Sequence, residues 1–516
     1  MLSTFYSAAL YGIDGFPVAV ECSADKRVPM FELVGLPDAA VKEAKERVRS
    51  ACRNSGIPFP SLDILVNLAP ANLKKEGSGF DLAILLAILA CDGRIPENAD
   101  IEHKCFIGEL SLSGSIRPIN GALCLALAAK AAGKTEVFVP TENAAEAAVV
   151  EGVTVFGVSS LTEVLQHLNG KKRIAPTVYD KSEFAAKKIL HDVDFADVRG
   201  QGAAKRALEI AAAGGHNVLL IGAPGSGKSM LAKRLPTILP DITFPEAVET
   251  TKIHSIAGYL RDNLVTERPF RSPHHTVSPV GMIGGGQSPR PGEISLAHNG
   301  VLFLDELPEF SKQLTEALRQ PLEDGAVTVI RAMAKVRFPA SFMLVAAMNP
   351  CRCGYYGDPN HVCTCNAGDV HRYLSRISGP MLDRMDIQIS VPSLTYDEMH
   401  ATRADAESSA TIRARVNRAR RFAEERLREA GLHSGVYCNA KLSPREVQTF
   451  CRPDENGELL LRRAFDVLGL SGRGHDKILR VARTIADLDE SETIRADHIA
   501  EAIGYRSLDR KFFGEK

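Results

Sequence analysis

The chain has 516 residues, of which 45% are hydrophobic and 24% are charged, and its formal net charge at pH 7 is −1. This composition excludes a disordered or fibrous protein, and the length predicts about three folded domains. The balanced charge excludes a uniformly basic nucleic-acid coat, although a local stripe of Lys and Arg would not appear in the sum.

The first residues and the cysteines predict a cytoplasmic protein with no membrane partner. Residues 1–6 lack the basic start and the apolar core of a signal peptide. The longest apolar run, residues 82–91, is about half as long as a bilayer span requires, so it predicts a buried helix. Cysteines number 11, and four of them are bunched between residues 351 and 365, which suits a reducing compartment better than a disulfide framework.

The first domain is expected over residues 1–168. It alternates strand-like runs with alanine-rich helical stretches, a pattern typical of an α/β or α+β domain. The strand-like runs are 18–22, 64–67 and 136–139, and the helical stretches are 39–50, 81–89 and 121–132. Two stretches, 75–83 and 114–121, resemble the proteolytic domain of Lon, a family that cuts peptides with a Ser-Lys dyad.

The dyad itself is missing from these stretches. Alignment with the Lon pattern places Gly79 at the serine position and Leu123 at the lysine position. Ser78 is adjacent, but a serine without a positioned base is not an activated nucleophile, so we interpret Ser78 as a small turn residue. The resemblance therefore implies a non-catalytic Lon-like fold, as in the DNA-repair protein RadA, rather than a protease.

Residues 169–192 are predicted to be a linker, because their hydrophobic residues follow neither the helical nor the strand period for any length. Their basic cluster, Lys171-Lys172-Arg173, either contacts a nucleic-acid backbone or is simply solvated.

A phosphate-binding loop is predicted at residues 222–229, Gly-Ala-Pro-Gly-Ser-Gly-Lys-Ser, which fit G-x-x-x-x-G-K-[ST] and follow the apolar run 218–221. In such a loop the backbone N–H groups and the next helix N-terminus face the phosphates of ATP, the lysine reaches the outer phosphates and the last serine ligates Mg²⁺. A chance glycine-rich turn is the alternative. The expected nucleotide-binding residues are Gly222, Gly225, Ser226, Gly227, Lys228 and Ser229.

Four long stretches together resemble the Mg-chelatase-like AAA+ proteins of the ComM (YifB) group: residues 194–239, 268–275, 291–300 and 376–384. The resemblance covers essentially the whole chain. It implies a P-loop AAA+ α/β core with a parallel sheet over residues 193–393, carrying an insert in its second helix, and an α-helical lid over 394–516. It also implies a homo-oligomeric ring, expected to be a hexamer.

Two further strands end in residues with hydrolytic chemistry. Residues 301–306, Val-Leu-Phe-Leu-Asp-Glu, form a Walker B pattern in which Asp305 joins the Mg²⁺ shell and Glu306 polarises the attacking water. An acidic pair that caps a helix is the alternative. Asn349 follows the apolar run 341–348 and would orient the same water as sensor 1, or it is a turn residue before Pro350.

Several arginines resemble family positions that stabilise transition-state charge. Arg384 resembles the finger that a subunit offers to its neighbour's γ-phosphate, with Arg376 as the second candidate and a surface ion pair as the alternative for either. Arg473 opens a helix that faces the nucleotide in the family's pattern and is the sensor-2 candidate, for which Arg480 could substitute.

Two inserts are expected to carry the DNA contacts. The family places a hairpin insert at residues 277–286, and a second hairpin, predicted over 327–338, carries Arg331, Lys335 and Arg337. In ring helicases both project into the central pore, where basic residues track phosphates without reading bases. An ordinary amphipathic hairpin is the alternative.

Two Cys-x-Cys pairs stand on a Gly/Pro/Asn-rich loop over residues 351–365. Such pairs can fold into one thiolate tetrahedron, which predicts a structural Zn²⁺ site, with His361 able to replace one thiolate. A redox pair or a chance cluster is the alternative. The expected ligands are Cys351, Cys353, Cys363 and Cys365.

The C-terminal residues show long helical patterns that predict an all-α bundle, at 397–406, 411–430, 459–468, 475–487 and 495–504. Seven arginines between 413 and 428 are interleaved with glutamates and indicate a solvated helix face.

The resemblance implies an ATP-driven, Mg²⁺-dependent motor that acts on branched or single-stranded DNA, as a hexameric branch-migration helicase in recombination or natural transformation. The alternative is a chelatase-type ATPase subunit that drives Mg²⁺ insertion into a porphyrin through a partner; the Lon-like front domain, which that subunit generally lacks, argues against it. The missing dyad argues against a third function, an ATP-dependent protease.

Overall fold

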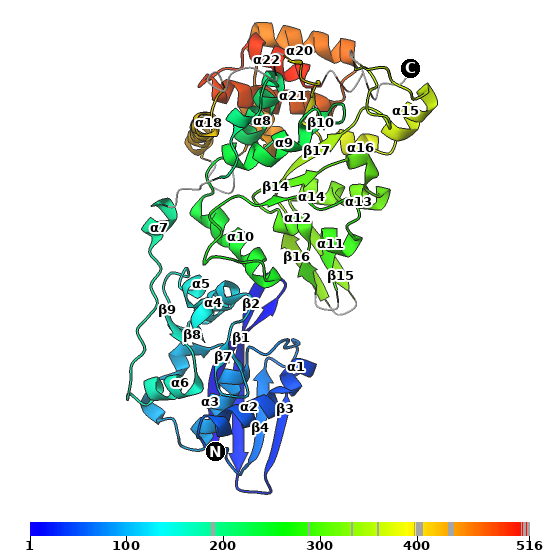
Figure 1. Cartoon of the computed structure of the whole chain (residues 1–516). Coiled ribbons are helices and arrows are strands. Elements are labelled where there is room, and N and C mark those ends of the chain that lie inside the picture. The colour runs from blue at the N-terminus through cyan, green and yellow to red at the C-terminus, as the bar shows by residue number, and fades with distance from the viewer. Residues whose placement is uncertain are drawn as a thin grey trace. The chain divides into compact units, whose positions relative to one another are not determined.

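The computed structural model describes residues 1–186, 191–286, 289–331, 334–358, 361–396, 398, 406–431, 438–506, 508 and 512. The chain forms two compact units (Figure 1). Unit 1 contains Met1–Lys187, Ala247–Thr266 and Ile330–Phe338, and unit 2 contains Lys188–Glu246, Glu267–Val329 and Pro339–Lys516.

Unit 1 begins with a four-stranded sheet in the order β1-β2-β4-β3. Its strands are β1 (Leu2–Tyr11), β2 (Asp14–Asp25), β3 (Met30–Val34) and β4 (Asp63–Ala69). β2 pairs antiparallel with both β1 and β4, while β3 runs parallel to β4. One face packs on α3 (Asp81–Cys91), which is apolar all round and buried at ten of its positions, as the apolar run predicts.

A second, three-stranded parallel sheet completes unit 1, with β8 in the centre. Its strands are β5 (Lys104–Phe106), β8 (Glu136–Pro140) and β9 (Thr154–Val158), and a short antiparallel pair is formed by β6 (Glu109–Leu110) and β7 (Ile116–Arg117). The remaining helices are α1 (Ala39–Lys42), α2 (Ala44–Asn54), α4 (Ala122–Ala131), α5 (Thr141–Ala147), α6 (Leu161–Leu168) and α7 (Lys181–Ala186), with 3-10 turns at Glu97–Ala99 and Ile101–His103.

One prediction for this region is wrong in detail. The single helix expected over 39–50 is interrupted at Glu43, which ends α1 and precedes α2, because the Asp38 side chain caps only the short first helix. The segment 169–192, predicted to be a linker, contains α7 and a bridge between Thr177 and Val155. Residues 187–190 of that segment lie outside the described residues.

Unit 2 is organised around a five-stranded parallel sheet in the order β11-β14-β17-β10-β18. Its strands are β10 (Val218–Ile221), β11 (Phe270–Arg271), β14 (Val301–Leu304), β17 (Met343–Met348) and β18 (Ile387–Ser390). β10, β14 and β17 are buried at every position, as expected for central parallel strands that are covered on both faces. The carboxyl ends of these three strands therefore meet at one edge of the sheet.

Along the chain, short helices and hairpins connect these strands, and two of the connections include the unit 1 segments Ala247–Thr266 and Ile330–Phe338. The helices are α8 (Gly202–Gly214), α9 (Lys228–Arg234), α10 (Phe244–Ala257), α11 (Pro279–Ile283), α12 (Glu293–Leu296), α13 (Lys312–Ala317), α14 (Arg319–Asp324), α15 (Ala367–Leu374) and α16 (Gly379–Leu382), with 3-10 turns at Phe195–Asp197, Leu235–Ile238 and Leu307–Glu309. The first insert, expected as a hairpin over residues 277–286, contains the helix α11 and the strand β12 (Gly284–Gly285), whose partner strand β13 (Arg290–Pro291) lies beyond these bounds. The second is the predicted hairpin, β15 (Ala326–Arg331) with β16 (Ala334–Pro339).

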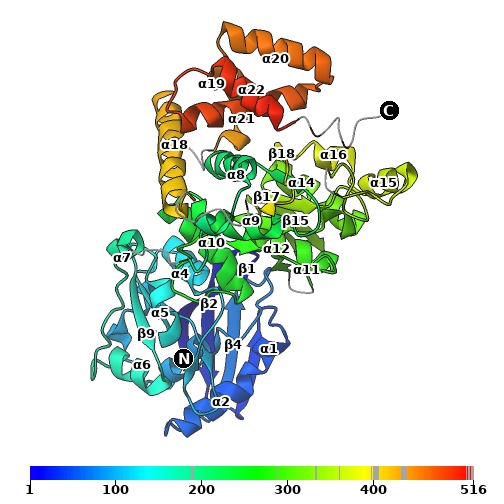
Figure 2. The ribbon, with the colours of Figure 1, turned by 45° about the horizontal axis from the view of Figure 1, so that its top comes forward.

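The C-terminal helices pack with α8 and the sheet in one hydrophobic core (Figure 2). They are α18 (Ser409–Glu429), α19 (Pro444–Phe450), α20 (Glu455–Leu468), α21 (Gly472–Leu488) and α22 (Ala496–Gly504), with a 3-10 turn at Asn439–Lys441. Side chains of Ser408, Ser443, Asp454 and Ser471 cap α18 to α21 at their N-termini. The helix expected over 397–406 lies almost wholly outside the described residues.

The predicted α/β class, the parallel sheet and the C-terminal helical region are confirmed. Across the part of the chain that the structure describes, none of the helices has the length and apolarity that crossing a bilayer requires.

Candidate active site

The loop at residues 222–229 joins β10 to α9 at the carboxyl edge of the unit 2 sheet. Gly225 and Gly227 adopt positive φ values of 77° and 92°, which favour glycine. Gly222 is required for a different reason, because a Cβ there would lie 2.2 Å from the carbonyl oxygen of Val391. The strand, loop and helix order is therefore the one that a phosphate-binding loop needs.

Lys228 is the buried cation of this loop. Its ammonium group donates to the carbonyl oxygens of Gly222 and Ala223, each at 2.8 Å, and to Oδ1 of Asn349 at 3.2 Å. Burial lowers the pKa of Lys228, and the nearby carboxylates of Asp305 and Glu306 offset only part of that effect. A phosphate anion beside this ammonium would therefore be strongly favoured.

Ser229 and Asp305 meet across the edge of the sheet. The Ser229 hydroxyl donates to Oδ2 of Asp305 at 2.6 Å. A hydroxyl and a carboxylate oxygen are the ligand types that Mg²⁺ takes when it also binds phosphates, so the pair fits a shared magnesium site.

Glu306 follows Asp305 in a left-handed conformation, with φ of 53°. Such a backbone is unfavourable for a residue other than glycine, and this strain is characteristic of functional positions. Its side chain is 60% exposed, and Oε2 lies 3.9 Å from Nδ1 of His275. His275 was missed by the sequence analysis, although the His274-His275 pair lies within one of the stretches that carry the family resemblance.

Asn349 is held at the end of β17 beside Lys228. The backbone N–H of Asn349 donates a hydrogen bond to the Tyr373 hydroxyl, which lowers the pKa of that hydroxyl, whereas burial has the larger effect and raises the pKa to about 12. Gln201 also reaches the loop, because its amide donates to the carbonyl oxygen of Ser226 at 3.3 Å. Tyr373 belongs to no sequence motif that would have identified it, whereas Gln201 lies within the stretch 194–239 that carries the family resemblance.

The arginine candidates are separate from this cluster. Arg384 donates to Glu323 and to the carbonyl oxygens of Arg319 and Pro380, and its side chain is only 11% exposed. Arg376 is 53% exposed, and its guanidinium lies 3.0 Å from both carboxylate oxygens of Glu309.

The two sensor-2 candidates, Arg473 and Arg480, differ in whether their side chains are bonded within their own chain. Arg473 is exposed in the first turn of α21. The pKa of Arg384 is lowered mainly by burial, and the positive charge of Arg473 adds to this effect. Arg480 is committed to its own chain, since Nε and Nη2 both donate to the carbonyl oxygen of Leu442, at 3.1 and 2.8 Å.

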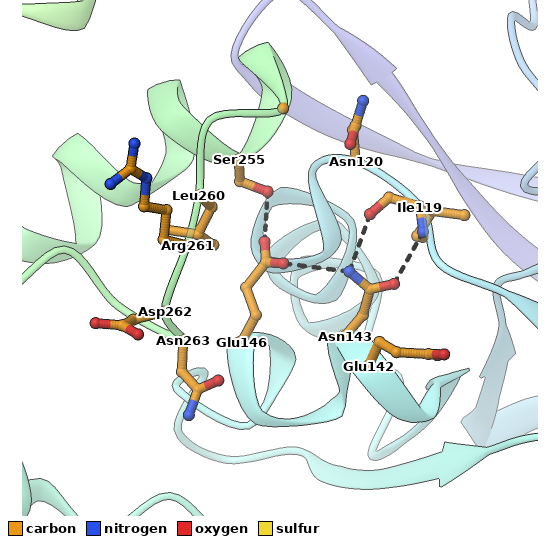
Figure 3. Close-up of a pocket in the computed structure, with 11 residues that line it drawn as sticks. Ile119, Asn120, Glu142, Asn143, Glu146, Ser255, Leu260, Arg261, Asp262 and Asn263 are labelled. Atoms are coloured by element: carbon orange, nitrogen blue, oxygen red, sulfur yellow. Dashed lines mark hydrogen bonds between the residues drawn. The ribbon is translucent and has the colours of Figure 1, made fainter.

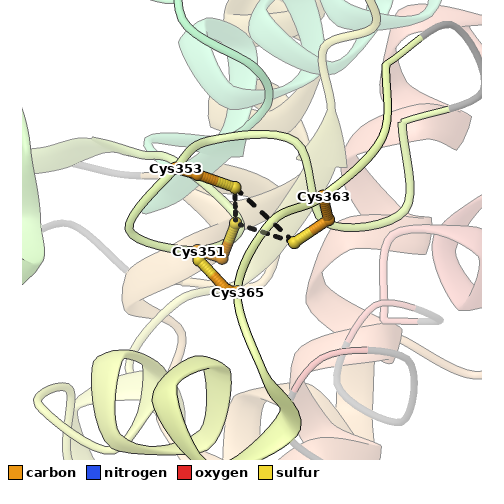
Figure 4. Close-up of side chains that lie close together, drawn as sticks. All are labelled: Cys351, Cys353, Cys363 and Cys365. Carbon is orange, nitrogen blue, oxygen red and sulfur yellow. Dashed lines mark hydrogen bonds between the residues drawn. The ribbon is translucent and has the colours of Figure 1, made fainter.

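The four predicted cysteine ligands come together after β17 (Figure 4). Their sulfur atoms all lie within 4.8 Å of one another, and three of the separations are 3.3, 3.5 and 3.7 Å. Those distances exceed a disulfide bond of about 2 Å. They fit a thiolate tetrahedron, whose edge is about 3.8 Å for metal–sulfur bonds of about 2.3 Å. The group can therefore hold a metal ion.

His361, the possible substitute ligand, stands outside this group. Its ring stacks on Tyr355 with centroids 4.8 Å apart, and Nδ1 lies 3.4 Å from Asp358. Within the cluster, the backbone N–H of Tyr355 lowers the pKa of the Cys353 thiol to about 5.

Comparisons with known proteins agree along the whole chain. Family models described as magnesium chelatase subunit ChlI, subunit ChlI of Mg-chelatase, and the ChlI C-terminal region match residues 194–399, 20–143 and 406–506. Competence protein ComM of Haemophilus influenzae is 42% identical over 515 residues, covering 99% of this chain and 98% of its own. The uncharacterized protein YifB of Escherichia coli is 42% identical over 513 residues with the same coverage.

The chain belongs to the Mg-chelatase-like ComM/YifB family. Membership indicates an AAA+ ATPase that uses ATP and Mg²⁺ and forms oligomers. The family prediction made from the sequence is thereby confirmed.

The N-terminal part of this ComM/YifB family member is also similar to part of the Lon proteases. Lon protease 2 of Bacillus subtilis is 28% identical over 128 residues, 25% of this chain and 22% of the protease. At the position aligned with the catalytic lysine, Leu123 is fully buried on α4. Ser78, beside the serine position Gly79, hydrogen-bonds to the carboxylate of Glu109 rather than to an amine.

A polar hollow of about 150 Å³ lies close to that lysine position, within unit 1 (Figure 3). Its hub is the buried Glu146, which accepts hydrogen bonds from the hydroxyl of Ser255 at 2.5 Å and from the backbone N–H of Leu123 at 2.8 Å. Asn143 donates to the same carboxylate and pairs with both backbone groups of Ile119. Burial raises the pKa of Glu146, and these hydrogen bonds offset it only in part.

Proposed function

We propose that the chain is an ATP-driven, ring-forming motor that acts on DNA as a hexameric branch-migration helicase in recombination or natural transformation. The observation that carries the proposal is the match over nearly the full length to a protein named for competence, the state in which cells take up DNA. The nucleotide cluster of Lys228, Ser229, Asp305 and Asn349 supports the ATP-driven part.

Each residue of this cluster has a proposed task. The N–H groups of residues 222–229 and the α9 N-terminus bind phosphate oxygens, and Lys228 exchanges its carbonyl partners for the outer phosphates. Ser229 and Asp305 would hold Mg²⁺, which would supply positive charge beside the phosphates. Glu306 polarises the attacking water and Asn349 orients it, while His275 lies within reach to position the Glu306 carboxylate.

A ring supplies what one subunit lacks. Arg384 acts in trans on the neighbour's γ-phosphate, and Arg473 acts as sensor 2 from the lid. Arg376 is the second finger candidate, and each arginine pairs with a carboxylate of its own chain, Arg376 with Glu309 and Arg384 with Glu323.

The boundaries that follow from this assignment are a Lon-like domain over residues 1–168, a linker over 169–192, the AAA+ core over 193–393 and the lid over 394–516.

DNA contact is assigned to the β15–β16 hairpin. Lys335 and Arg337 are exposed on β16, two residues apart and therefore on one face of the strand. Two cations on one exposed face suit a phosphate backbone and carry no base specificity. The side chain of Arg331, the third basic residue predicted there, lies outside the described residues.

The metal at the four cysteines is proposed to be Zn²⁺, because a set of four thiolates at tetrahedral spacing is a structural zinc site. All 11 cysteines are free, which favours a reducing compartment such as the cytoplasm. Metal analysis of protein purified without chelator should give about one zinc per chain. A stoichiometry near zero would rule out the assignment.

The chelatase function is the second candidate, favoured by the descriptions of the three family models. One of those models covers residues 20–143, so the front domain does not by itself distinguish this chain from a chelatase subunit. A direct assay has to decide between the two.

The deciding experiment incubates the purified protein and ATP with a labelled four-way junction, and in parallel with Mg²⁺ and porphyrin and with casein. We expect DNA-stimulated hydrolysis and junction resolution by the wild type, and neither by Glu306→Gln, which retains ATP binding. Absence of both activities in the wild type would reject the DNA motor.

The hairpin assignment is tested by the salt dependence of DNA binding. Lys335→Ala combined with Arg337→Ala should reduce the slope of log K against log salt by about 1.4 on single strands, since each phosphate contact contributes about 0.7. Lys312→Ala combined with Arg372→Ala, two exposed cations on α13 and α15, is the matched control. An unchanged slope for the hairpin variant would move the DNA contact elsewhere.

A further inference from the structure

The segment from Cys351 to Arg376, here called the cysteine segment, begins two residues after Asn349 and contacts the phosphate-binding loop, Asn349 and the turn after the Walker B strand. Its described residues before α15 form no helix or strand, and residues 359 and 360 lie outside the described part. A fixed conformation of such a segment must come from contacts between residues far apart in the sequence, because no helix or strand holds it.

The first contact is with the phosphate-binding loop. Gly354 has φ of 92°, and a Cβ at this position would lie 2.3 Å from Cδ of Pro224. Pro224 is the third residue of the loop that holds Lys228. The backbone next to Cys353 therefore lies against the phosphate-binding loop, without room for a side chain.

The second contact is with the sensor residue. α15 begins at Ala367, two residues after Cys365, and the side chain of Asn366 caps it. From the last turn of α15, the hydroxyl of Tyr373, a residue only 9% exposed, reaches back to the backbone of Asn349. Through Tyr373, the cysteine segment therefore contacts Asn349, which precedes the segment by two residues.

The third contact is with the turn that follows the Walker B strand. Nη1 of Arg376 lies 3.0 Å from the Glu309 carboxylate and 3.3 Å from the carbonyl oxygen of Pro308. These residues follow Glu306 within one turn of chain. One segment therefore contacts the phosphate loop, the sensor and the Walker B turn.

We propose that the metal ion held by the four cysteines is the clamp that sets these three contacts, so that metal binding positions Asn349 for ATP hydrolysis. The ion joins Cys351 and Cys353, beside Gly354, to Cys363 and Cys365, beside the start of α15. Closing this loop fixes where α15 begins and hence where Tyr373 meets Asn349. The inference rests on the ATPase and metal assignments made above and does not depend on DNA.

The contact is tested without disturbing the cysteines by Tyr373→Phe. We expect the variant to keep its metal and its affinity for a fluorescent ATP analogue, while kcat for ATP hydrolysis without DNA falls about 5-fold, as one lost hydrogen bond predicts. Tyr505→Phe is the matched control. Tyr505 is 7% exposed and directly follows the lid helix α22, and its hydroxyl donates to Glu501 of that helix at 3.0 Å. Its kcat should equal that of the wild type.

The clamp itself is tested by Cys363→Ser combined with Cys365→Ser. We expect loss of the bound metal and a fall in kcat of at least about 10-fold, with the affinity for the ATP analogue changed by less than about 3-fold. Cys52→Ser is the control for thiol removal, because the Cys52 thiol already donates to the carbonyl oxygen of Ile57 and a hydroxyl can replace it.

The outcomes separate this proposal from the proposed function. A wild type that hydrolyses ATP while both variants keep its kcat would overturn the clamp and leave the motor intact. So would a wild type that hydrolyses ATP but holds no metal. A wild type with metal, hydrolysis and the predicted losses, but with no effect on DNA junctions, would support the clamp and reject the helicase.

Discussion

Two regions of the chain match families of enzymes, yet only one of them has its chemical groups facing one another. At the nucleotide cluster, Lys228, Ser229, Asp305 and Asn349 lie within hydrogen-bonding distance in two linked pairs. At the Lon-like positions, Gly79 has no functional group and Leu123 is buried, and the nearby Glu146 is already paired with protein donors. A fold can therefore persist after its chemistry is lost, and activity has to be argued from side chains.

The largest expected effect concerns the nucleotide region, which should remain incomplete in one subunit. Arg384→Ala should reduce kcat on the order of 1000-fold, because a finger in trans stabilises charge only in the transition state. Mixing Arg384→Ala subunits with inactive Lys228→Ala subunits should recover part of the activity, since some sites then have both an intact lysine and an intact neighbouring arginine. Steady-state ATPase assays over a range of mixing ratios measure this.

Arg376→Ala is the comparison variant, with a loss below about 10-fold and no recovery in mixtures, because the finger is assigned to Arg384 and removal of Arg376 breaks only a half-exposed ion pair with Glu309. The control is Arg372→Ala, which removes a side chain that is 81% exposed. If the Arg376 variant instead recovers on mixing and the Arg384 variant does not, the finger has been assigned to the wrong arginine.

The second prediction asks whether the Lon-like region can regain its lysine. Leu123→Lys should destabilise unit 1 by about 3 to 5 kcal/mol, because the position is fully buried and an ammonium there would be desolvated. Leu123→Met, which conserves volume, should cost less than about 1.5 kcal/mol. Limited proteolysis in urea, with the fragments of unit 1 followed by mass, compares the variants.

Peptidase assays complete this test. Leu123→Lys combined with Gly79→Ser should remain inactive on casein. A stable double variant that cleaves casein would mean that the site is still built for proteolysis and that only two side chains were lost.

The sequence predicted those elements whose signal is local. The phosphate loop follows from glycine spacing after an apolar strand, and α3 follows from an uninterrupted apolar run. The four cysteines could be grouped because all of them lie within one short loop. By contrast, His275 and Tyr373 approach the cluster through tertiary packing, and neither has a sequence pattern that encodes its partner. The break at Glu43 was missed because one cap residue decides it.

The smallest expected effect concerns the hydrogen bonds from Leu123, Asn143 and Ser255 to the Glu146 carboxylate. It tests whether these bonds shield the carboxylate from solvent. Burial raises the folded-state pKa of Glu146 above its unfolded value of about 4.3, so the folded state holds its proton to higher pH than the unfolded state does. The contribution to stability is therefore fully present below the unfolded pKa and is lost as pH rises through the folded pKa. Glu146→Gln removes this titration, so the wild type should lose local stability relative to the variant as pH rises above the unfolded pKa of about 4.3.

The Leu123 amide reports this directly, because it donates to the Glu146 carboxylate. Its hydrogen-exchange protection, corrected for the intrinsic exchange rate, should fall with rising pH in the wild type and stay level in Glu146→Gln. Glu142→Gln is the control on the same helix, since Glu142 is exposed at the rim of the hollow. Identical pH profiles in the wild type and Glu146→Gln would mean that Glu146 ionises as it would in water, and that the hollow is open to solvent rather than closed by its own hydrogen bonds.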